Sequence, residues 1–273
     1  MELREHGRIA YREALPADGA DDAPVALLVH GYPESSYMWR HVLSALADAG
    51  WRTIAPDLIG FGDTPADPPA TWERQVEAVE RLRSGLGISR CALVVHDWGG
   101  LIGLRWACDH PDAVWAVVAS DTGFFADGRW HGMADVLRTP GQGEQLVDGM
   151  TRESFGGLLA SISSGIGERS ATEYFKEFAD EPRRRGQLEL YRSGGFEKLR
   201  PYEGRLAALE VPFLALWGED DAFAPVAGAH RFAKEIPGAR VHIVSGSGHF
   251  VFDDAPEETA EALAAFLSAA APR

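Results

Sequence analysis

Three ionisable side chains in this sequence each stand directly after a segment with the pattern of a buried strand. Asp97 follows the apolar run 91–95, Asp221 follows a strand expected over 212–217, and His249 follows one expected over 241–244. Because the carboxyl ends of parallel strands meet at one edge of a sheet, we expect these side chains to lie together. Two carboxylates and a histidine in that arrangement can perform nucleophilic and acid–base chemistry.

Asp97 stands at the tip of a predicted strand–turn–helix. The apolar run ends at a polar pair, and Gly99, Gly100 and a helical pattern from residue 101 follow it. At such a turn the side chain projects beyond the sheet edge, near helical N–H groups that favour an anion. A carboxylate with a pKa near its reference value of about 3.9 is ionised without help from a base. It could attack a saturated carbon that carries a leaving group and form an ester, although capping the helix is the alternative role.

His249, in the turn Gly-Ser-Gly-His, is the candidate base that activates water to cleave this ester. Asp221 is the candidate acid that holds the histidine, and the neighbouring Asp220 is the alternative. The sequence order of nucleophile, acid and histidine has the large first gap that an inserted segment would produce. We assign structural roles to His30 and His96, and expect the side chain of His96 to point away from the site.

Composition narrows the possible partners. The 273 residues carry 26 basic and 41 acidic side chains, and the net charge of −15 argues against nucleic acid or an anionic membrane as a partner. No apolar segment has the length of a signal or a membrane span, so a cytoplasmic location is expected. Cys91 and Cys108 are expected to be reduced thiols in the core. The sequence has no phosphate-binding loop and no metal-ligand spacing, so we expect neither a cofactor nor a metal.

Strand and helix patterns alternate along most of the chain. A hairpin is expected over 3–14, strands over 25–29, 52–55 and 114–120, and helices over 71–85, 227–236 and 256–270. This alternation predicts an α/β fold with a mostly parallel sheet covered by helices on both faces. Between residues 121 and 206 no convincing strand pattern occurs. We therefore expect a core domain built from 1–120 and 207–273, interrupted by a helical cap over 121–206.

The sequence resembles a known family over nearly its whole length. The strand–turn–helix at Asp97 is similar to the nucleophile elbow of the α/β-hydrolases, with Asp in place of the usual Ser. The segments His30-Gly31-Tyr32-Pro33-Glu34 and His96-Asp97-Trp98-Gly99 resemble the aspartate-nucleophile branch, which comprises epoxide hydrolases and haloalkane dehalogenases. The resemblance implies the α/β-hydrolase fold, a small apolar organic substrate and water as the second reactant. It also implies that the backbone N–H groups of Tyr32 and Trp98 stabilise an oxyanion.

Epoxide hydrolases and haloalkane dehalogenases differ in the leaving group. For an epoxide, the resemblance implies that cap tyrosines protonate the oxygen, and Tyr191 is the first candidate with Tyr174 a weaker second. For a haloalkane, it implies that Trp98 and a second donor hold the halide, and Trp130 is the candidate for that donor. Packing is the alternative role for each of these aromatic residues. We favour epoxide opening because of the sequence of the loop 32–35 and the candidate Tyr191. Haloalkane dehalogenation is the alternative. A catalytically silent binding protein is a third, weaker hypothesis.

Overall fold

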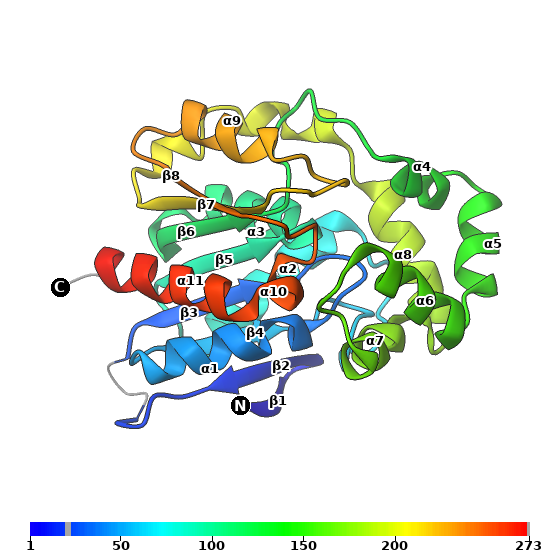
Figure 1. The fold of residues 1–273 in the computed structure, drawn as a ribbon, viewed down its shortest axis with the longest axis horizontal. Coiled ribbons are helices and arrows are strands. Elements are labelled where there is room, and N and C mark those ends of the chain that lie inside the picture. Colours follow the sequence, from blue (N-terminus) through cyan, green and yellow to red (C-terminus); the bar gives the residue numbers. More distant parts are fainter. Residues whose placement is uncertain (20–22, 272–273) are drawn as a thin grey trace.

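The core of the fold is one eight-stranded sheet, seen in the computed structural model that describes residues 1–19 and 23–271 (Figure 1). Its order is β1-β2-β4-β3-β5-β6-β7-β8. The strands are β1 (Glu2–His6), β2 (Ile9–Ala14), β3 (Val25–Val29), β4 (Arg52–Pro56), β5 (Cys91–His96), β6 (Val114–Ser120), β7 (Phe213–Gly218) and β8 (Arg240–Val244).

Strands β3 to β8 run parallel to one another, and at one edge β2 pairs antiparallel with β4 and β1 pairs antiparallel with β2. All residues of β5, β6 and β7 are buried, as expected for strands covered on both faces. In the register His96 pairs with Ser120 and Gly218 with Val244, so the strands end side by side. The mostly parallel sheet predicted from the sequence is confirmed.

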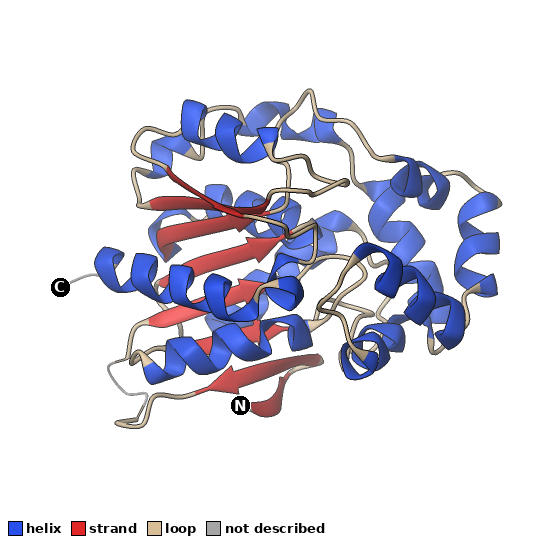
Figure 2. Ribbon diagram, in the orientation of Figure 1, coloured by secondary structure: helices blue, strands red, loops and turns tan. Residues whose placement is uncertain are grey.

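Helices cover both faces of this sheet (Figure 2). Helices α1 (Arg40–Asp48) and α11 (Pro256–Ala270) pack together on one face, and α2 (Trp72–Gly85) and α3 (Trp98–Asp109) pack together on the other. Helix α9 (Ala227–Glu235) packs on β7 and β8. The short helices η1 (Ser36–Trp39), η2 (Pro111–Ala113), η5 (Ala207–Leu209) and α10 (Val251–Asp254) complete this part of the chain.

Residues 121–212, all of which the structure describes, contain helices and no strand. Most of the helices lie beyond the carboxyl ends of the strands, at the right of Figure 1. These are α4 (Gly132–Arg138), α5 (Gln142–Gly149), α6 (Arg152–Ile162), α7 (Glu168–Tyr174), η3 (Phe175–Phe178) and α8 (Glu181–Ser193). The chain then returns along α3 through η4 (Phe196–Tyr202), where the Tyr202 hydroxyl bonds to Asp109. The Thr151 and Asp180 side chains accept hydrogen bonds from the first turns of α6 and α8, which fixes where these helices begin.

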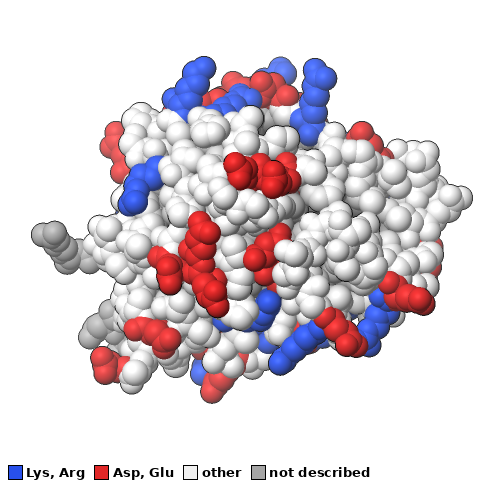
Figure 3. Space-filling model, viewed as in Figure 1, with Lys and Arg blue, Asp and Glu red and all other residues white. Residues whose placement is uncertain are grey.

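The surface agrees with the acidic composition, since Figure 3 shows acidic side chains across the middle of one face and most basic side chains nearer its margins. Within the described residues, no helix is both long enough and apolar enough to cross a membrane.

Candidate active site

Asp97 lies at the sharp turn between β5 and α3, in the left-handed backbone region with φ of 48°. A residue with a Cβ atom adopts this conformation at a cost of about 1–2 kcal/mol, which tertiary contacts must offset. The turn depends on close approach to the loop after β3. A Cβ atom added at Gly31 would overlap the Asp97 side chain, and one added at Gly99 would overlap the carbonyl oxygen of Val29. Glycine at these positions lets the loop and the turn meet.

The two carboxylate oxygens of Asp97 have different surroundings. The backbone N–H of Tyr32 donates to Oδ1 over 2.7 Å, whereas Oδ2 lies 3.6 Å from Nε2 of His249. Burial alone would raise the pKa of Asp97, but the nearby charge of His249 and the hydrogen bond from the Tyr32 N–H hold this pKa below its ordinary value. Asp97 is therefore an ionised carboxylate whose Oδ2 is free to act as a nucleophile.

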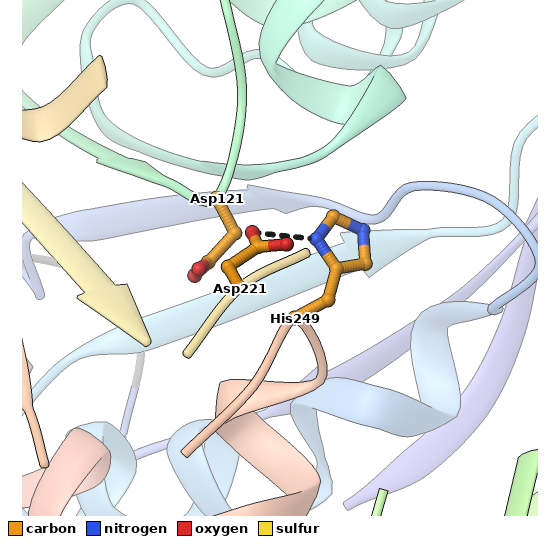
Figure 4. Close-up of side chains that lie close together, drawn as sticks. All are labelled: Asp121, Asp221 and His249. Atoms are coloured by element: carbon orange, nitrogen blue, oxygen red, sulfur yellow. Dashed lines mark hydrogen bonds and ion pairs between the residues drawn. The ribbon is translucent and has the colours of Figure 1, made fainter. Parts of the chain in front are cut away.

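His249 and Asp221 form a buried acid–base pair (Figure 4). Nδ1 of His249 lies 2.8 Å from Oδ2 of Asp221, while Oδ1 of Asp221 accepts hydrogen bonds from the N–H groups of Phe223 and Ala224. Burial disfavours the imidazolium, but the charge of Asp221 outweighs it and raises the pKa of His249 well above its ordinary value. Asp220 is exposed, so the structure brings Asp221 and not Asp220 to the histidine.

A third acid, Asp121, was missed in the sequence analysis. It directly follows β6, is fully buried with φ of 46°, and lies beside the Asp221–His249 pair (Figure 4). The Gly218 N–H donates to its Oδ1 over 3.0 Å, and the Ser120 hydroxyl donates to Oδ2 over 2.5 Å. Burial and the nearby charge of Asp221 raise its pKa well above the ordinary value, so its surroundings favour the neutral form more than those of Asp221 do. Its place directly after a buried strand was the signal available in the sequence.

Asp121, Asp221 and His249 offer ligand atoms within 4.8 Å of one another, which is compatible in distance with a bound cation. However, hydrogen bonds already occupy these atoms, because Asp221 bonds to the imidazole and to two backbone N–H groups, and Asp121 bonds to Gly218 and Ser120. The arrangement has the character of a hydrogen-bonded acid–base set.

A largely apolar cavity lies over Asp97 and His249. Its apolar lining suits a small apolar organic molecule. Tyr32, Pro33, Phe223 and Phe250 form part of this lining. The rest of the lining comes from the helical segment 121–206, with His131, Met133, Leu146, Met150, Phe155, Leu158, Leu159, Ile162, Phe178 and Tyr191.

The predicted leaving-group residues divide into two groups. Tyr191 lines the cavity, and its ring centroid lies 5.1 Å from that of Tyr32 and 5.2 Å from that of Trp98. Trp130 stacks on Trp98 with centroids 5.4 Å apart. The structure does not bring Tyr174 to the cavity lining, because its hydroxyl donates to Oδ2 of Asp253 over 2.6 Å.

Trp98 carries a buried indole N–H that makes no hydrogen bond to any residue within 1–19 and 23–271. The Tyr191 ring lies edge-on to the indole, with an interplanar angle of 77°, and burial raises the pKa of Tyr191 well above its ordinary value. A buried donor without a partner is costly in a native protein. The site beside Asp97 therefore has an unused N–H donor and a phenol.

The expectation for His96 was wrong in one respect. Its ring does not point away from the site but packs against that of His249, with centroids 4.9 Å apart. Its Nε2 lies 2.8 Å from the carbonyl oxygen of His249. The alternation of side chains along a strand does not reveal that the loop carrying His249 folds back over His96.

Comparison with known proteins agrees with this geometry. Residues 24–256 match the family described as alpha/beta hydrolase fold. A haloalkane dehalogenase of Mycobacterium marinum is 32% identical, with 94% of this chain and 87% of the relative covered. Epoxide hydrolase 3 of Xenopus tropicalis is 29% identical, with coverage of 96% and 78%.

Among solved structures, a haloalkane dehalogenase of Bradyrhizobium elkani superposes with a TM-score of 0.84 at 27% identity, covering 98% of this chain and 97% of that one. The epoxide hydrolase VrEH1 of Vigna radiata superposes with a TM-score of 0.82 at 22% identity, covering 98% of both chains, and this likeness concerns the fold. The chain belongs to the α/β-hydrolase family, in the aspartate-nucleophile branch that contains the haloalkane dehalogenases and epoxide hydrolases.

Proposed function

We propose that this hydrolase releases halide from small apolar haloalkanes. The observation that carries the proposal is the indole N–H of Trp98, which is buried and has no partner among the described residues, on a side chain that lines a small pocket together with Asp97 and Tyr191. A halide leaves as a stable anion and needs only weak donors, whereas an alkoxide needs a proton. Only one candidate cap tyrosine, Tyr191, lines the cavity, since the hydroxyl of Tyr174 bonds to Asp253.

In the first step, Oδ2 of Asp97 attacks the carbon that bears the halogen. The new carbon–oxygen bond forms as the carbon–halogen bond breaks, and the halide leaves with the bonding electrons toward the indole N–H of Trp98. Tyr32 keeps Oδ1 of Asp97 in place through its backbone N–H. This step needs an ionised Asp97 but no base, and it leaves a neutral alkyl ester.

In the second step, water attacks the ester carbonyl carbon while Nε2 of His249 takes its proton. The oxyanion lies against the Tyr32 N–H, with the Trp98 backbone N–H as the proposed second donor. Collapse breaks the bond between this carbon and the alkyl oxygen, and the departing alcohol takes a proton from the imidazolium. Overall, haloalkane and water give alcohol, halide and one proton.

The two steps are coupled through charge. Two carboxylates, Asp97 and Asp221, raise the pKa of His249 in the free enzyme. Alkylation neutralises Asp97, so the pKa of His249 falls toward its ordinary value when a base is required. Asp221 keeps its charge and holds the imidazole by Nδ1 throughout.

Epoxide opening, which the sequence analysis favoured, remains the second candidate. The supporting observation is the Tyr191 phenol, which lines the cavity near Asp97 and could protonate an epoxide oxygen. The epoxide hydrolase relative also supports it. The dehalogenases among the relatives, together with Trp98, favour halide release.

A substrate panel tests the choice. Purified protein is offered bromoalkanes, chloroalkanes and terminal epoxides, with halide and diol measured in parallel and Asp97→Ala as the blank. We expect halide release that Trp98→Phe weakens more than Tyr191→Phe. Diol formation without halide release, lost in Tyr191→Phe, would replace the proposal with epoxide hydrolysis.

We further propose that the helices of residues 121–206 act as a cap on a core formed by 1–120 and 207–273. Residues 272–273 of that core lie outside the described residues. The contribution of this segment to the cavity lining supports the proposal. A cytoplasmic location, and the lack of nucleic-acid or membrane partners, stay predictions from the sequence.

A further inference from the structure

Glu34 and His96 form a buried pair that the mechanism above does not use. Glu34 is 1% exposed, His96 is fully buried, and Oε2 of Glu34 lies 2.9 Å from Nδ1 of His96. Neither residue lines the cavity over Asp97. A buried carboxylate–imidazole pair adds little net stability compared with apolar side chains of the same volume. Stability alone therefore does not account for the pair.

The pair connects the three loops that carry the reacting groups. Glu34 belongs to the loop after β3 that supplies the Tyr32 N–H, and His96 immediately precedes Asp97. Nε2 of His96 reaches the carbonyl oxygen of His249 over 2.8 Å. One chain of contacts thus runs from the Tyr32 loop through the end of β5 to the backbone of the base.

The proton arrangement in this chain is fixed by chemistry. A carbonyl oxygen only accepts, so Nε2 of His96 must carry a proton and donate to His249. At Nδ1 the charge of Glu34, 2.9 Å away, raises the pKa of His96 to about 9 against the opposing effect of burial. Whether or not Nδ1 carries a proton, the Nε2–H bond to His249 is intact.

We propose that Glu34 and His96 are positioning residues that hold the backbone of His249, and with it the imidazole, at the Asp97 ester. This inference rests on the two-step mechanism proposed above. Hydrolysis requires a water molecule aligned between His249 and the ester, so it is sensitive to small displacements of the ring. Alkylation requires only the Asp97 carboxylate. Loss of the hydrogen bond from His96 to the His249 carbonyl should therefore slow hydrolysis of the ester and leave alkylation unchanged.

A matched pair of substitutions separates positioning from general packing. In His96→Asn the amide takes the place of Nδ1 and can still bond to Glu34, but no donor reaches the His249 carbonyl. In His96→Gln the amide takes the place of Nε2 and restores that donor. His242→Asn is the control, since His242 lies on β8 and makes only an exposed hydrogen-bond contact with Glu258.

We expect a bromoalkane to give a full burst of bromide with His96→Asn, followed by turnover about 10²-fold slower than wild type. Intact-protein mass spectrometry should then show the accumulated alkyl ester. His96→Gln should recover most of the turnover and accumulate little ester, and His242→Asn should match wild type. Equal losses in His96→Asn and His96→Gln without ester would overturn the inference and leave only a packing role.

Two further measurements keep the test decisive. If His96→Asn does not fold, ¹⁵N-histidine NMR of the wild-type protein reports the protonation of His96 directly, and an unprotonated Nε2 would overturn the inference. The variant His249→Gln tests the two-step mechanism on which the inference rests. Absence of ester in His249→Gln would contradict the two-step scheme, whereas ester there with unchanged hydrolysis in His96→Asn would contradict only the positioning role.

Discussion

The substitution Asp221→Asn should stop the enzyme after its first step, and the structure dictates how. Oδ1 of Asp221 accepts hydrogen bonds from the N–H groups of Phe223 and Ala224 over 2.7 and 3.0 Å. An asparagine must turn its amide oxygen toward these two donors. Its NH₂ group then faces Nδ1 of His249, which can only respond by accepting.

This orientation places the imidazole proton on Nε2, where it blocks uptake of a proton from water. The same reversal of the histidine tautomer costs about 10⁴-fold in a serine protease triad. At about 1.36 kcal/mol for each factor of ten, this corresponds to about 5.4 kcal/mol of lost stabilisation in the hydrolytic transition state. Alkylation uses no base, so its rate constant should change by less than about tenfold.

Rapid-quench measurement of bromide separates the two steps. We expect Asp221→Asn to release one bromide per active site in a burst, with steady turnover lower by about 10³- to 10⁴-fold. Asp121→Asn is the matched control, because the surroundings of Asp121 favour its neutral form and an amide oxygen can still accept from the Gly218 N–H. Its turnover should stay within about tenfold of wild type. Exposed Asp220→Asn should have no effect.

The reverse pattern would refute this reasoning. If Asp221→Asn turns over nearly as fast as wild type while Asp121→Asn gives only the burst, then Asp121 holds the histidine during hydrolysis. Loss of the burst itself in Asp221→Asn, in a protein that still folds, would mean that alkylation depends on the acid and that the two steps are not separable in the way proposed.

Three other perturbations have defined outcomes. Gly31→Ala should lower the alkylation rate by about 10²-fold or more in the bromide assay, because the added methyl group overlaps the Asp97 side chain; unchanged kinetics would contradict the close approach. Tyr174→Phe should lower the free energy of unfolding by about 1.5–3 kcal/mol, through the lost bond to Asp253, and leave turnover intact; a loss of turnover in a folded protein would return Tyr174 to the site. The raised pKa of His96 should make stability pH-dependent: its contribution is full below the unfolded pKa of about 6.5 and is lost as pH rises through about 9. The free energy of unfolding, measured by denaturant titration at several pH values, should therefore fall more steeply over this range for wild type than for His96→Gln. An equal pH dependence of the two proteins would argue against the charged pair.

The sheet and the order of its chemistry-bearing loops could be predicted because local patterns encode them. Apolar runs such as 91–95 and 114–120 are long enough to specify buried strands, and a polar residue directly after each run specifies the sheet edge. Asp97 was recognisable in this way, and His249 from its place in the turn Gly-Ser-Gly-His after a predicted strand. Asp221 was distinguishable from Asp220 only by the turn chemistry around Pro225.

The remaining features depend on contacts between distant segments. Whether Tyr174 or Tyr191 faces the substrate depends on how α7 and α8 pack, and the hydroxyl of Tyr174 turns to Asp253, 79 residues later in the chain. Asp121 followed the same strand-end rule as Asp97 and could have been included. The bond from His96 to the carbonyl of His249 spans 153 residues, and no local periodicity encodes it.

The central claim is that an ester on Asp97 is formed and then cleaved at its carbonyl carbon. Single-turnover reaction with excess enzyme in H₂¹⁸O, followed by peptide mass spectrometry, tests it most directly. The account predicts one ¹⁸O atom in the peptide that contains Asp97 and an alcohol that carries unlabelled oxygen from the carboxylate. Label in the alcohol of the first turnover, with none in Asp97, would mean that water attacks the substrate directly and would contradict the account.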